Sequence, residues 1–398
     1  MSRLSKRELN TAFALSSVVG LRLFGVFLIM PVFTVYAVDL PGATPFLVGL
    51  AIGIYGFAQA LLQVPVGLAS DRFGRHLTIT IGLLVFIAGS VVAALAQGID
   101  GIIVGRVLQG LGAVSGASQA LAADHSDADN RSKVMGIIGV SIGAAFVLAI
   151  ILSAPLAAVS GLSGLFGLTA VLALGAIVLL WVVVPRPARR RAPAAARLPD
   201  VLRMVVRPQL AVLNVSVFMM HAMLTAAFVA LPLLLTRRTG IALTDQWQLY
   251  LPVMLVSALV MGGVLRRVTS LAGSMRLVLV CALGLGVALA GFAADAHDQL
   301  VLWLAAVVFF SAFNLLEANL PSLVSRLAPA DLRGAAMGGF ATCQFLGAGM
   351  GGLLGGVMMQ RVGLSAVFWA GVALVVIWLP LLWWGRRHVI AAGAPVTA

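Results

Sequence analysis

The chain has 398 residues, of which 61% are hydrophobic and 10% are charged, and its formal net charge is +13 at pH 7. Soluble globular domains carry about 25% charged residues, so this composition excludes a soluble enzyme or a soluble binding domain. With a mean hydropathy of +1.09, the chain is apolar enough to cross a lipid bilayer many times.

Twelve apolar segments follow one another along the chain, and each is long enough for a membrane-spanning helix of about 20 residues. The first is too long for a signal-peptide core and no cleavage site follows it, so we expect it to be retained. Cys281 and Cys343 lie inside apolar segments, so we expect no disulfide, metal site or cofactor. The expected fold is an all-α membrane protein with helices near 11–36, 46–68, 77–97, 99–120, 132–156, 164–184, 208–235, 247–265, 275–294, 299–323, 334–358 and 363–384.

Basic residues alternate in number between successive connections. If the N-terminus is cytoplasmic, 21 of the 26 Lys and Arg residues fall on the cytoplasmic side, and only Arg237, Arg238 and Arg361 fall on the other side. The positive-inside rule therefore predicts that both termini are cytoplasmic. It also explains the charge of +13 without nucleic acid as a partner.

Two halves of the chain share short patterns. Asp129-x-Arg131-x3-Met135-Gly136 recurs as Asp331-x-Arg333-x3-Met337-Gly338, and Phe27-x3-Pro31 recurs as Phe228-x3-Pro232, with offsets of 202 and 201 residues. Nearly equal offsets indicate a duplication. We expect a six-helix half over 1–184, a cytoplasmic linker over 185–207, a second six-helix half over 208–385 and a short cytoplasmic tail over 386–398. The Ala, Pro and Arg-rich linker is interpreted as a solvated tether that meets anionic lipid, with a regulatory partner site as the alternative.

A charged ten-residue stretch, Gly67 to His76, interrupts the apolar sequence between the second and third helices. Its Gly, Asp, Arg, Gly and Arg spacing resembles the loop between helices 2 and 3 of the major facilitator superfamily of secondary transporters. The resemblance implies a cytoplasmic gate in which Asp71 pairs with Arg75 and Arg75 reaches Asp124. His76 stands where the family usually has Lys or Arg and is interpreted as a tolerated surface substitution. The gate residues are Gly67, Asp71, Arg72, Gly74, Arg75 and Asp124.

Further motifs resemble the same superfamily. Arg106-x2-Gln109-Gly110-x-Gly112-Ala113 matches the pattern of its fourth helix. The fifth helix carries Gly139, Gly143 and Pro155, interpreted as a helix-packing motif, but Ser153-Ala154-Pro155 stands where antiporters have Gly-Pro and a glycine pair. The chain is most similar to the YajR-like branch of bacterial drug:proton antiporters, through Gly20-Leu21-Arg22, Ile52-Gly53-Ile54-Tyr55-Gly56, Ala312-Phe313-Asn314-Leu315-x-Glu317 and Gln344-Phe345-Leu346-Gly347. Larger members of that branch carry an extra C-terminal soluble domain, which we do not expect here.

Six glycines between residues 347 and 356 contain a G-x-G pattern, but no strand precedes them and they lie in a spanning segment, so a dinucleotide site is not expected. We expect these glycines to let the helices near 334–358 and 46–68 pack closely and slide.

Four ionisable residues lie in the membrane interior, namely Arg22, Arg106, His221 and Glu317. They fall on the first, fourth, seventh and tenth helices, which line the central cavity in the resembled family. Charges at this depth are costly unless they are paired or hydrated, so they predict a polar cavity. The candidate cavity residues for protons or substrate are Glu317, Arg22, His221, Arg106, Gln109 and Asn314. For each the alternative is a structural role: a fixed counter-ion for the charged groups, and a hydrogen-bonded packing side chain for the histidine and the amides.

These observations predict a transporter that works by alternating access, with proton-coupled efflux of a small organic compound as the leading function. Uptake by proton symport, or facilitated diffusion, is the alternative within the same class. A membrane-embedded enzyme or an assembly subunit is the alternative of another class, although the sequence shows no nucleophile and base pair, metal-ligand cluster or phosphate loop. The excess of cationic side chains in the cavity favours neutral or anionic substrates. We expect a monomer in the bacterial inner membrane, with protons, the substrate and the lipid bilayer as its partners.

Overall fold

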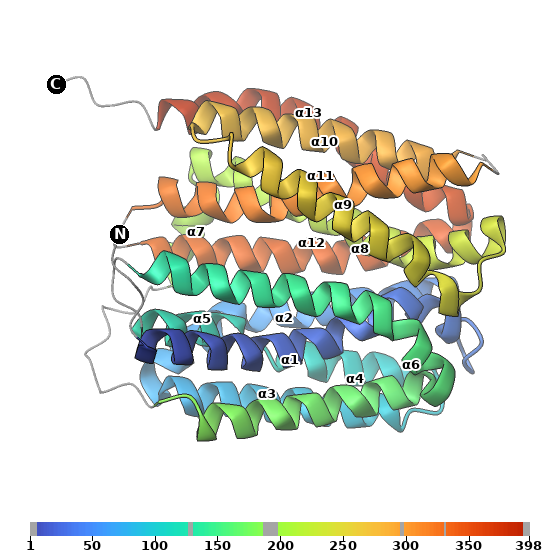
Figure 1. Cartoon of the computed structure of the whole chain (residues 1–398), viewed down its shortest axis with the longest axis horizontal. Helices are drawn as coiled ribbons and strands as arrows, with labels where there is room; N and C mark the ends of the chain where they lie inside the picture. Colours follow the sequence, from blue (N-terminus) through green and yellow to red (C-terminus); the bar gives the residue numbers. More distant parts are fainter. Residues whose placement is uncertain (1–5, 126–129, 186–197, 295–297, 330–331, 393–398) are drawn as a thin grey trace. The chain divides into compact units, whose positions relative to one another are not determined.

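We describe the protein from a computed structural model, which defines residues 6–125, 130–185, 198–294, 298–329 and 332–392. The described residues are almost entirely helical (Figure 1). Ten of the described helices are long and apolar enough to cross a membrane. The protein is therefore an all-helical, multi-pass membrane protein, as the composition predicts.

The chain folds into two compact units, and each is described by itself. Unit 1 comprises Met1–Ala43 and Leu61–Ala195, and unit 2 comprises Thr44–Ala60 and Ala196–Ala398. One helix, α2 (Pro45–Phe73), contributes its first half to unit 2 and its second half to unit 1. The other described helices of unit 1 are α1 (Lys6–Ala37), α3 (Arg75–Ala94), α4 (Ile99–Leu111), α5 (Ser115–Asp124) and α6 (Arg131–Val182).

The first and the longest helix of unit 1, α1 and α6, lie side by side (Figure 1). Small polar side chains join them: Ser141 donates to the carbonyl of Ser16 at 2.9 Å and Ser153 to that of Leu28 at 2.6 Å. Such bonds hold membrane helices together where the hydrophobic effect between them is absent. The 52-residue α6 covers both helices predicted over 132–156 and 164–184, and it bends at Gly161, whose φ of +64° favours glycine.

The turn between the second and third predicted helices is much shorter than the sequence indicates. We predict a ten-residue turn over Gly67 to His76, but α2 continues to Phe73 and α3 begins at Arg75, so Gly74 alone separates them. Its φ of +97° lets the chain reverse within one residue. The charged stretch is therefore helix on both sides of a glycine.

The helix predicted over 99–120 is also different, because it is interrupted between α4 and α5. Gly112 ends α4 with a non-helical ψ of 35°. A Cβ built at Gly112 would lie 2.6 Å from the carbonyl oxygen of Gly82 in α3, so a close approach of two backbones coincides with the break. The interruption leaves backbone carbonyls without partners from their own helix, and these need donors from elsewhere.

In unit 2, α8 and α12 pack most extensively against each other. The unit's elements after the first half of α2 are α7 (Leu198–Val206), α8 (Pro208–Thr239), the 3-10 turn η1 (Leu243–Asp245), α9 (Trp247–Leu265), α10 (Leu271–Ala293), α11 (Gln299–Leu327), α12 (Arg333–Arg361) and α13 (Leu364–Ala391).

Glycines let α12 approach two helices within unit 2. Cβ atoms built at Gly49 and Gly53 of α2 would meet the α12 backbone, and one built at Gly352 would lie 2.5 Å from the nitrogen of Gly53. On another face of α12, Gly347 and Gly351 press against the carbonyls of Phe218 and Ala222 of α8. The predicted close packing of these glycines is confirmed, and it explains why the first half of α2 belongs to unit 2. Sliding of the two helices stays a prediction.

Part of the predicted linker is ordered helix. Val201 and Met204 of α7 are buried, and a Cβ built at Gly339 of α12 would touch Val205. The interpretation of 185–207 as a solvated tether is therefore wrong for α7, because Val201 and Val205, one helical turn apart, pack on Gly339 of α12. Residues 186–197 lie outside the described part of the chain, as do Asp129 and Asp331 of the repeated pattern.

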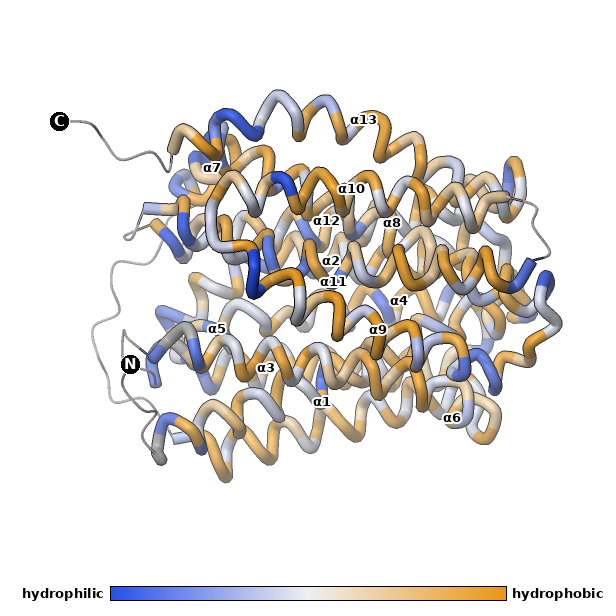
Figure 2. The backbone as a smooth tube through the Cα atoms, turned by 45° about the horizontal axis from the view of Figure 1, so that its top comes forward, coloured by the Kyte–Doolittle hydropathy of each residue, from blue (hydrophilic) through white to orange (hydrophobic). Residues whose placement is uncertain are grey.

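Hydrophilic residues gather near the ends of the helices, while the helix centres are mostly hydrophobic (Figure 2). This distribution is expected where helix centres lie in hydrocarbon and helix ends lie in water. The polar side chains that occur away from the ends are therefore the ones that need an explanation.

Candidate functional site

In unit 2, the side chains of His221, Glu317 and Gln344 meet from α8, α11 and α12. Nε2 of Gln344 lies 2.9 Å from Nε2 of His221 and donates to Oε1 of Glu317 at 3.2 Å. Nε2 of His221 lies 3.6 Å from the second oxygen of Glu317. The ring of Phe313, one turn before Glu317, packs edge-on against His221 with centroids 5.6 Å apart. We call His221, Glu317 and Gln344 the polar cluster.

Backbone contacts define the proton positions on His221. Its Nδ1 lies 3.1 Å from the carbonyl of Val217, which can only accept, so Nδ1 carries a proton. In the neutral ring Nε2 is then an acceptor, and the two hydrogens of the Gln344 amide bridge His221 and Glu317. If Nε2 gains a proton it becomes a donor and faces Glu317, and the Gln344 amide group must turn away. The protonation of the pair is thus coupled to the position of Gln344.

The carboxyl of Glu317 is accessible although it lies on a spanning helix. Its side chain is 43% exposed, whereas that of His221 is 11% exposed. A carboxylate facing hydrocarbon costs about 2.5–3.5 kcal/mol even on the mildest scale. Glu317 is therefore expected to face a polar, water-accessible space, with His221 behind it.

Asn314 lies one turn from Glu317 but contacts a different helix. Its amide donates to Ser257 of α9 at 2.7 Å, and Ser257 donates to the carbonyl of Phe310 at 3.0 Å. The structure therefore places Asn314 in a bond between α11 and α9, as in the structural alternative for this residue.

In unit 1, Arg106 and Gln109 are buried together on α4. Arg106 donates to the amide oxygen of Gln109 at 2.9 Å, and Gln109 donates to Ser90 of α3 at 2.8 Å. Their residues are 3% and 0% exposed. This chain of hydrogen bonds joins α4 to α3 and holds the guanidinium of Arg106 in one position.

Arg22 of α1 reaches the interruption between α4 and α5. It donates to the carbonyl of Gly112 at 3.3 Å, and its guanidinium lies 5.1 Å from the ring centre of Phe86. Arg22 thus satisfies a carbonyl that the helix break exposes, and the aromatic face supports its charge. The structural alternative for Glu317 is that it neutralises Arg22 or Arg106. The polar partners of Glu317 within unit 2 are instead His221 and Gln344, and pairing with an arginine stays a prediction.

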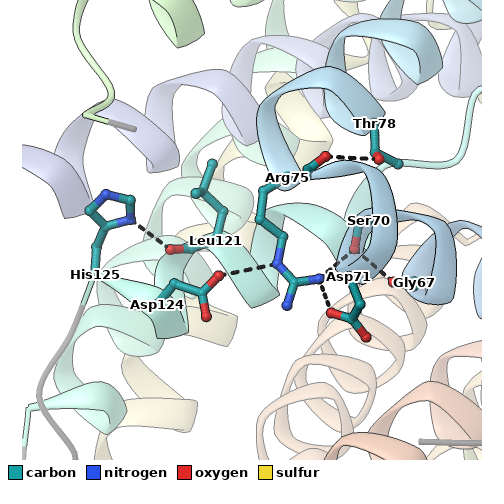
Figure 3. A network of polar contacts seen from close by, with 9 residues as sticks. Gly67, Ser70, Asp71, Arg75, Thr78, Leu121, Asp124 and His125 are labelled. Atoms are coloured by element: carbon teal, nitrogen blue, oxygen red, sulfur yellow. Dashed lines mark hydrogen bonds and ion pairs between the residues drawn. The ribbon is translucent and has the colours of Figure 1, made fainter. Parts of the chain in front are cut away.

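Three of the predicted gate residues, Asp71, Arg75 and Asp124, meet beside the junction of α2 and α3 (Figure 3). Arg75 pairs with Asp71 one turn before it and donates to Asp124 of α5 at 3.1 Å, as the sequence predicts. Arg75 also contacts Ser70, which donates to the carbonyl of Gly67 at 2.7 Å. One guanidinium therefore ties the end of α2 to the end of α5.

Other residues of this junction differ from expectation. Arg72 is exposed and lies over the ring of its neighbour Phe73. No described atom lies within 4 Å of a Cβ built at Gly67 or Gly74, so Gly74 serves the reversal of the chain and not a close approach. His76 is 7% exposed, lies 3.2 Å from the carbonyl of Val184 and packs on Trp181, so its interpretation as a surface substitution is wrong.

The predicted helix-packing residues of α6 are exposed in the structure. Around Gly139 and Gly143, no atom of the described residues lies within 4 Å of a built Cβ, and Pro155 is exposed as well. The contacts of α6 with α1 use its serines. A packing role for Gly139, Gly143 and Pro155 therefore stays a prediction.

Comparisons with known proteins identify the family. The sequence pattern of the Major Facilitator Superfamily matches residues 15–352. The inner membrane transport protein YajR of Escherichia coli is 39% identical over 382 residues, covering 95% of this chain and 83% of that protein. The fold resembles a bacterial homologue of the human lysosomal transporter Spinster in its inward-facing, occupied conformation, with a TM-score of 0.78, 14% identity and coverage of 99% and 100% of the two chains. It also resembles the human organic anion transporter MFSD10, with a TM-score of 0.73, 20% identity and coverage of 95% and 100%.

The chain belongs to the major facilitator superfamily, and it is a membrane transporter. Members of this family move solutes and are not enzymes, so the alternative of a membrane-embedded enzyme is excluded.

Sequence reasoning missed Gln344 and Ser90 as members of these clusters. Neither residue is ionisable, and neither lies close in sequence to an ionisable residue of the membrane interior. Gln344 is a polar side chain within the glycine-rich apolar sequence of α12, and that signal could have found it.

Proposed function

We propose that this transporter is a secondary active transporter that exports a small organic compound in exchange for protons. The observation that carries the proposal is the polar cluster, in which an accessible carboxyl on α11 lies beside a buried imidazole on α8 and shares the amide of Gln344 with it. A carboxyl that water can reach, on a helix within an apolar bundle, is suited to bind and release a proton.

The proposed topology has twelve spans and both termini in the cytoplasm of a bacterium, in the inner membrane. The ten long helices give twelve crossings if α6 crosses twice, on either side of Gly161, and if α4 and α5 together make one crossing. The halves over 1–184 and 208–385, joined through 185–207, then act as the two moving bodies of alternating access. A monomer suffices for this mechanism.

In the proposed cycle, Glu317 is protonated from one side of the membrane and deprotonated towards the other. The neutral and charged carboxyl bind differently to Gln344 and His221, so the proton biases the equilibrium between two conformations by its differential binding. Arg22 and Arg106 supply a constant positive field in the cavity, and Gln109 holds Arg106 in place. This field favours a neutral or anionic substrate over a lipophilic cation.

The gate is proposed to stabilise one conformation. Asp71, Arg75 and Asp124 hold the end of α2 against α5. This contact stabilises only those conformations in which it forms. Gly67, Gly74 and Arg72 shape the junction, while Gly139, Gly143 and Pro155 are proposed to offer a face of α6 for close approach during the cycle.

The experiment uses purified protein in liposomes with an imposed proton gradient. Neutral and anionic compounds are first ranked by thermal stabilisation, since a ligand at 100 times its Kd adds about 2.7 kcal/mol. The proposal expects a stabilising compound to move against its own gradient when protons flow the opposite way. Movement together with protons would indicate the uptake symporter, and movement that only follows the compound's gradient would indicate a facilitator. Either result overturns antiport.

A further inference from the structure

A cleft lined by arginines lies between the beginning of α10 and the end of α13. Its volume is about 460 Å³, and its lining includes Arg276 and Leu279 of α10 with Arg386, Arg387 and Ile390 of α13. The two helices lie side by side (Figure 1), and Gly371 of α13 is close enough to Leu289 of α10 that a Cβ built there would lie 2.9 Å away. The cleft therefore lies between two helices that pack against each other further along their length.

The charge of this cleft is unbalanced. Three guanidinium groups line it and its lining residues include no carboxylate. Within the described part of the chain, none of the three forms an ion pair with an acidic side chain. Like charges gathered in one cleft repel one another, so an anion that neutralises them is favoured there.

Two of the arginines are held in place by tryptophans. The guanidinium of Arg386 lies over the ring of Trp383, 3.3 Å from its centre, and Arg387 donates to the carbonyl of Trp384 at 3.2 Å. These contacts restrict the side chains before any ligand binds, which lowers the entropy cost of binding. Tryptophan and arginine together are also typical of the membrane interface.

Below the arginines the cleft opens onto a strongly apolar surface. On α10, Val280, Leu283 and Val287 are 64%, 53% and 69% exposed and follow one face of the helix. On α13, Trp383 and Ile377 are 61% and 56% exposed. A ligand that fits this arrangement has an anionic head and a long apolar body.

We propose that this cleft binds the phosphate headgroup of an anionic phospholipid, whose acyl chains lie along the exposed faces of α10 and α13. Arginine is suited to this ligand because its planar fork donates two parallel hydrogen bonds to a phosphate. In the orientation proposed above, the lipid belongs to the cytoplasmic leaflet. The site lies apart from the polar cluster and does not depend on what is transported.

The test measures lipid retention by the full chain in detergent micelles, with native mass spectrometry after delipidation and titration with phosphatidylglycerol. The variants are Arg276→Gln and the pair Arg386→Gln with Arg387→Gln. Each arginine near a membrane surface contributes about a fivefold factor in binding to anionic lipid. We expect about fivefold weaker retention for Arg276→Gln, more than tenfold for the pair, and no change for the zwitterionic phosphatidylethanolamine.

Two controls make the test specific. Arg276→Lys keeps the charge and should retain most of the binding, and it also checks for misfolding. Arg266→Gln with Arg267→Gln removes two arginines at the end of α9, outside the cleft, and should leave phosphatidylglycerol bound. The proposal is overturned if the cleft variants bind phosphatidylglycerol like the parent, if the α9 variants lose as much, or if phosphatidylethanolamine binds equally well. Displacement of phosphatidylglycerol by an equal concentration of inorganic phosphate would overturn a lipid in favour of a soluble phosphate.

Discussion

The two units handle buried charge in different ways. Unit 1 buries Arg22 and Arg106, whose guanidinium groups keep their charge at every physiological pH, and fixes both with hydrogen bonds to Gly112 and Gln109. Unit 2 places Glu317 and His221 together, and each of these side chains can gain or lose a proton. Of the four ionisable residues in the membrane interior, the two arginines therefore lie in unit 1 and the two that can exchange a proton lie in unit 2.

The surroundings of the charges support this division. Arg22 and Arg106 are 2% and 3% exposed, so they are locked within unit 1 and stabilise its structure. The Glu317 side chain is 43% exposed and can exchange a proton with water. Substitution of Arg22 or Arg106 should therefore mainly lower the stability of unit 1. Substitution of Glu317 or His221 should mainly impair the coupling of transport to protons.

The largest effect is expected for Glu317→Gln. This change keeps the size of the side chain and its hydrogen bonding but removes the exchangeable proton, so transport driven by a proton gradient should fall at least 100-fold. Binding of a stabilising compound, measured by thermal shift, should persist. Asp245→Asn, which removes a carboxyl from the exposed turn η1, is the matched control and should transport normally. Normal proton-driven transport by Glu317→Gln would refute the role of this carboxyl.

Arg22→Ala should lower the stability of unit 1. The substitution leaves the buried carbonyl of Gly112 without this donor, and an unsatisfied buried group costs about 1–3 kcal/mol. We expect a lower thermal unfolding temperature in detergent. Arg22→Gln keeps a donor and should lose less. A pH profile that moves in Arg22→Ala without loss of stability would show that Arg22 acts on the proton site.

Gln344→Leu should have an intermediate effect on unit 2. It removes the amide that joins His221 to Glu317, and one or two hydrogen bonds of about 1 kcal/mol each correspond to roughly fivefold to thirtyfold slower proton-driven transport. Thr342→Val is a control on the same helix, because Thr342 bonds only to the carbonyl of Gly338 in its own helix. Equal rates for Gln344→Leu and the parent would remove Gln344 from the site.

The smallest effect is expected at the gate. Asp71 is 22% exposed at its side chain, and exposed ion pairs contribute about 0–1 kcal/mol, so Asp71→Asn should change stability by less than 1 kcal/mol. It should nevertheless shift the distribution of distances between spin labels at the Phe73 end of α2 and the Arg333 end of α12, because the contact forms in one conformation only. Arg266→Gln removes an exposed charge at the end of α9, outside this junction, and is the control. Identical distance distributions in Asp71→Asn and the parent would leave the motif with a role in folding alone.

Much of the architecture could be predicted because apolar length is a strong signal. The contact of Arg75 with Asp71 and Asp124 and the glycine packing of α12 were also predictable, since both follow from motifs with defined spacing. The one-residue turn at Gly74 was not, because a charged helix end beyond the bilayer looks like a loop in sequence.

The remaining differences arise from contacts between distant segments. His76 is buried by Trp181 and Val184, which come about a hundred residues later in the chain. The break after Gly112 is supported by Arg22 and α3, and α7 is helical where it packs on α12. Gln344 joins the polar cluster because three helices meet there. The contacts of His76 and the support of Gly112 by Arg22 leave no local pattern in the sequence.

The most direct test of the division between the units is infrared difference spectroscopy of the purified protein across a pH titration. A protonated carboxyl in a membrane interior has a carbonyl band that is separate from those of the amides and of carboxylates. If Glu317 exchanges the proton, such a pH-dependent band is present in the parent and in Arg22→Gln and absent in Glu317→Gln. If the band persists unchanged in Glu317→Gln, the carboxyl that exchanges the proton lies elsewhere in the molecule.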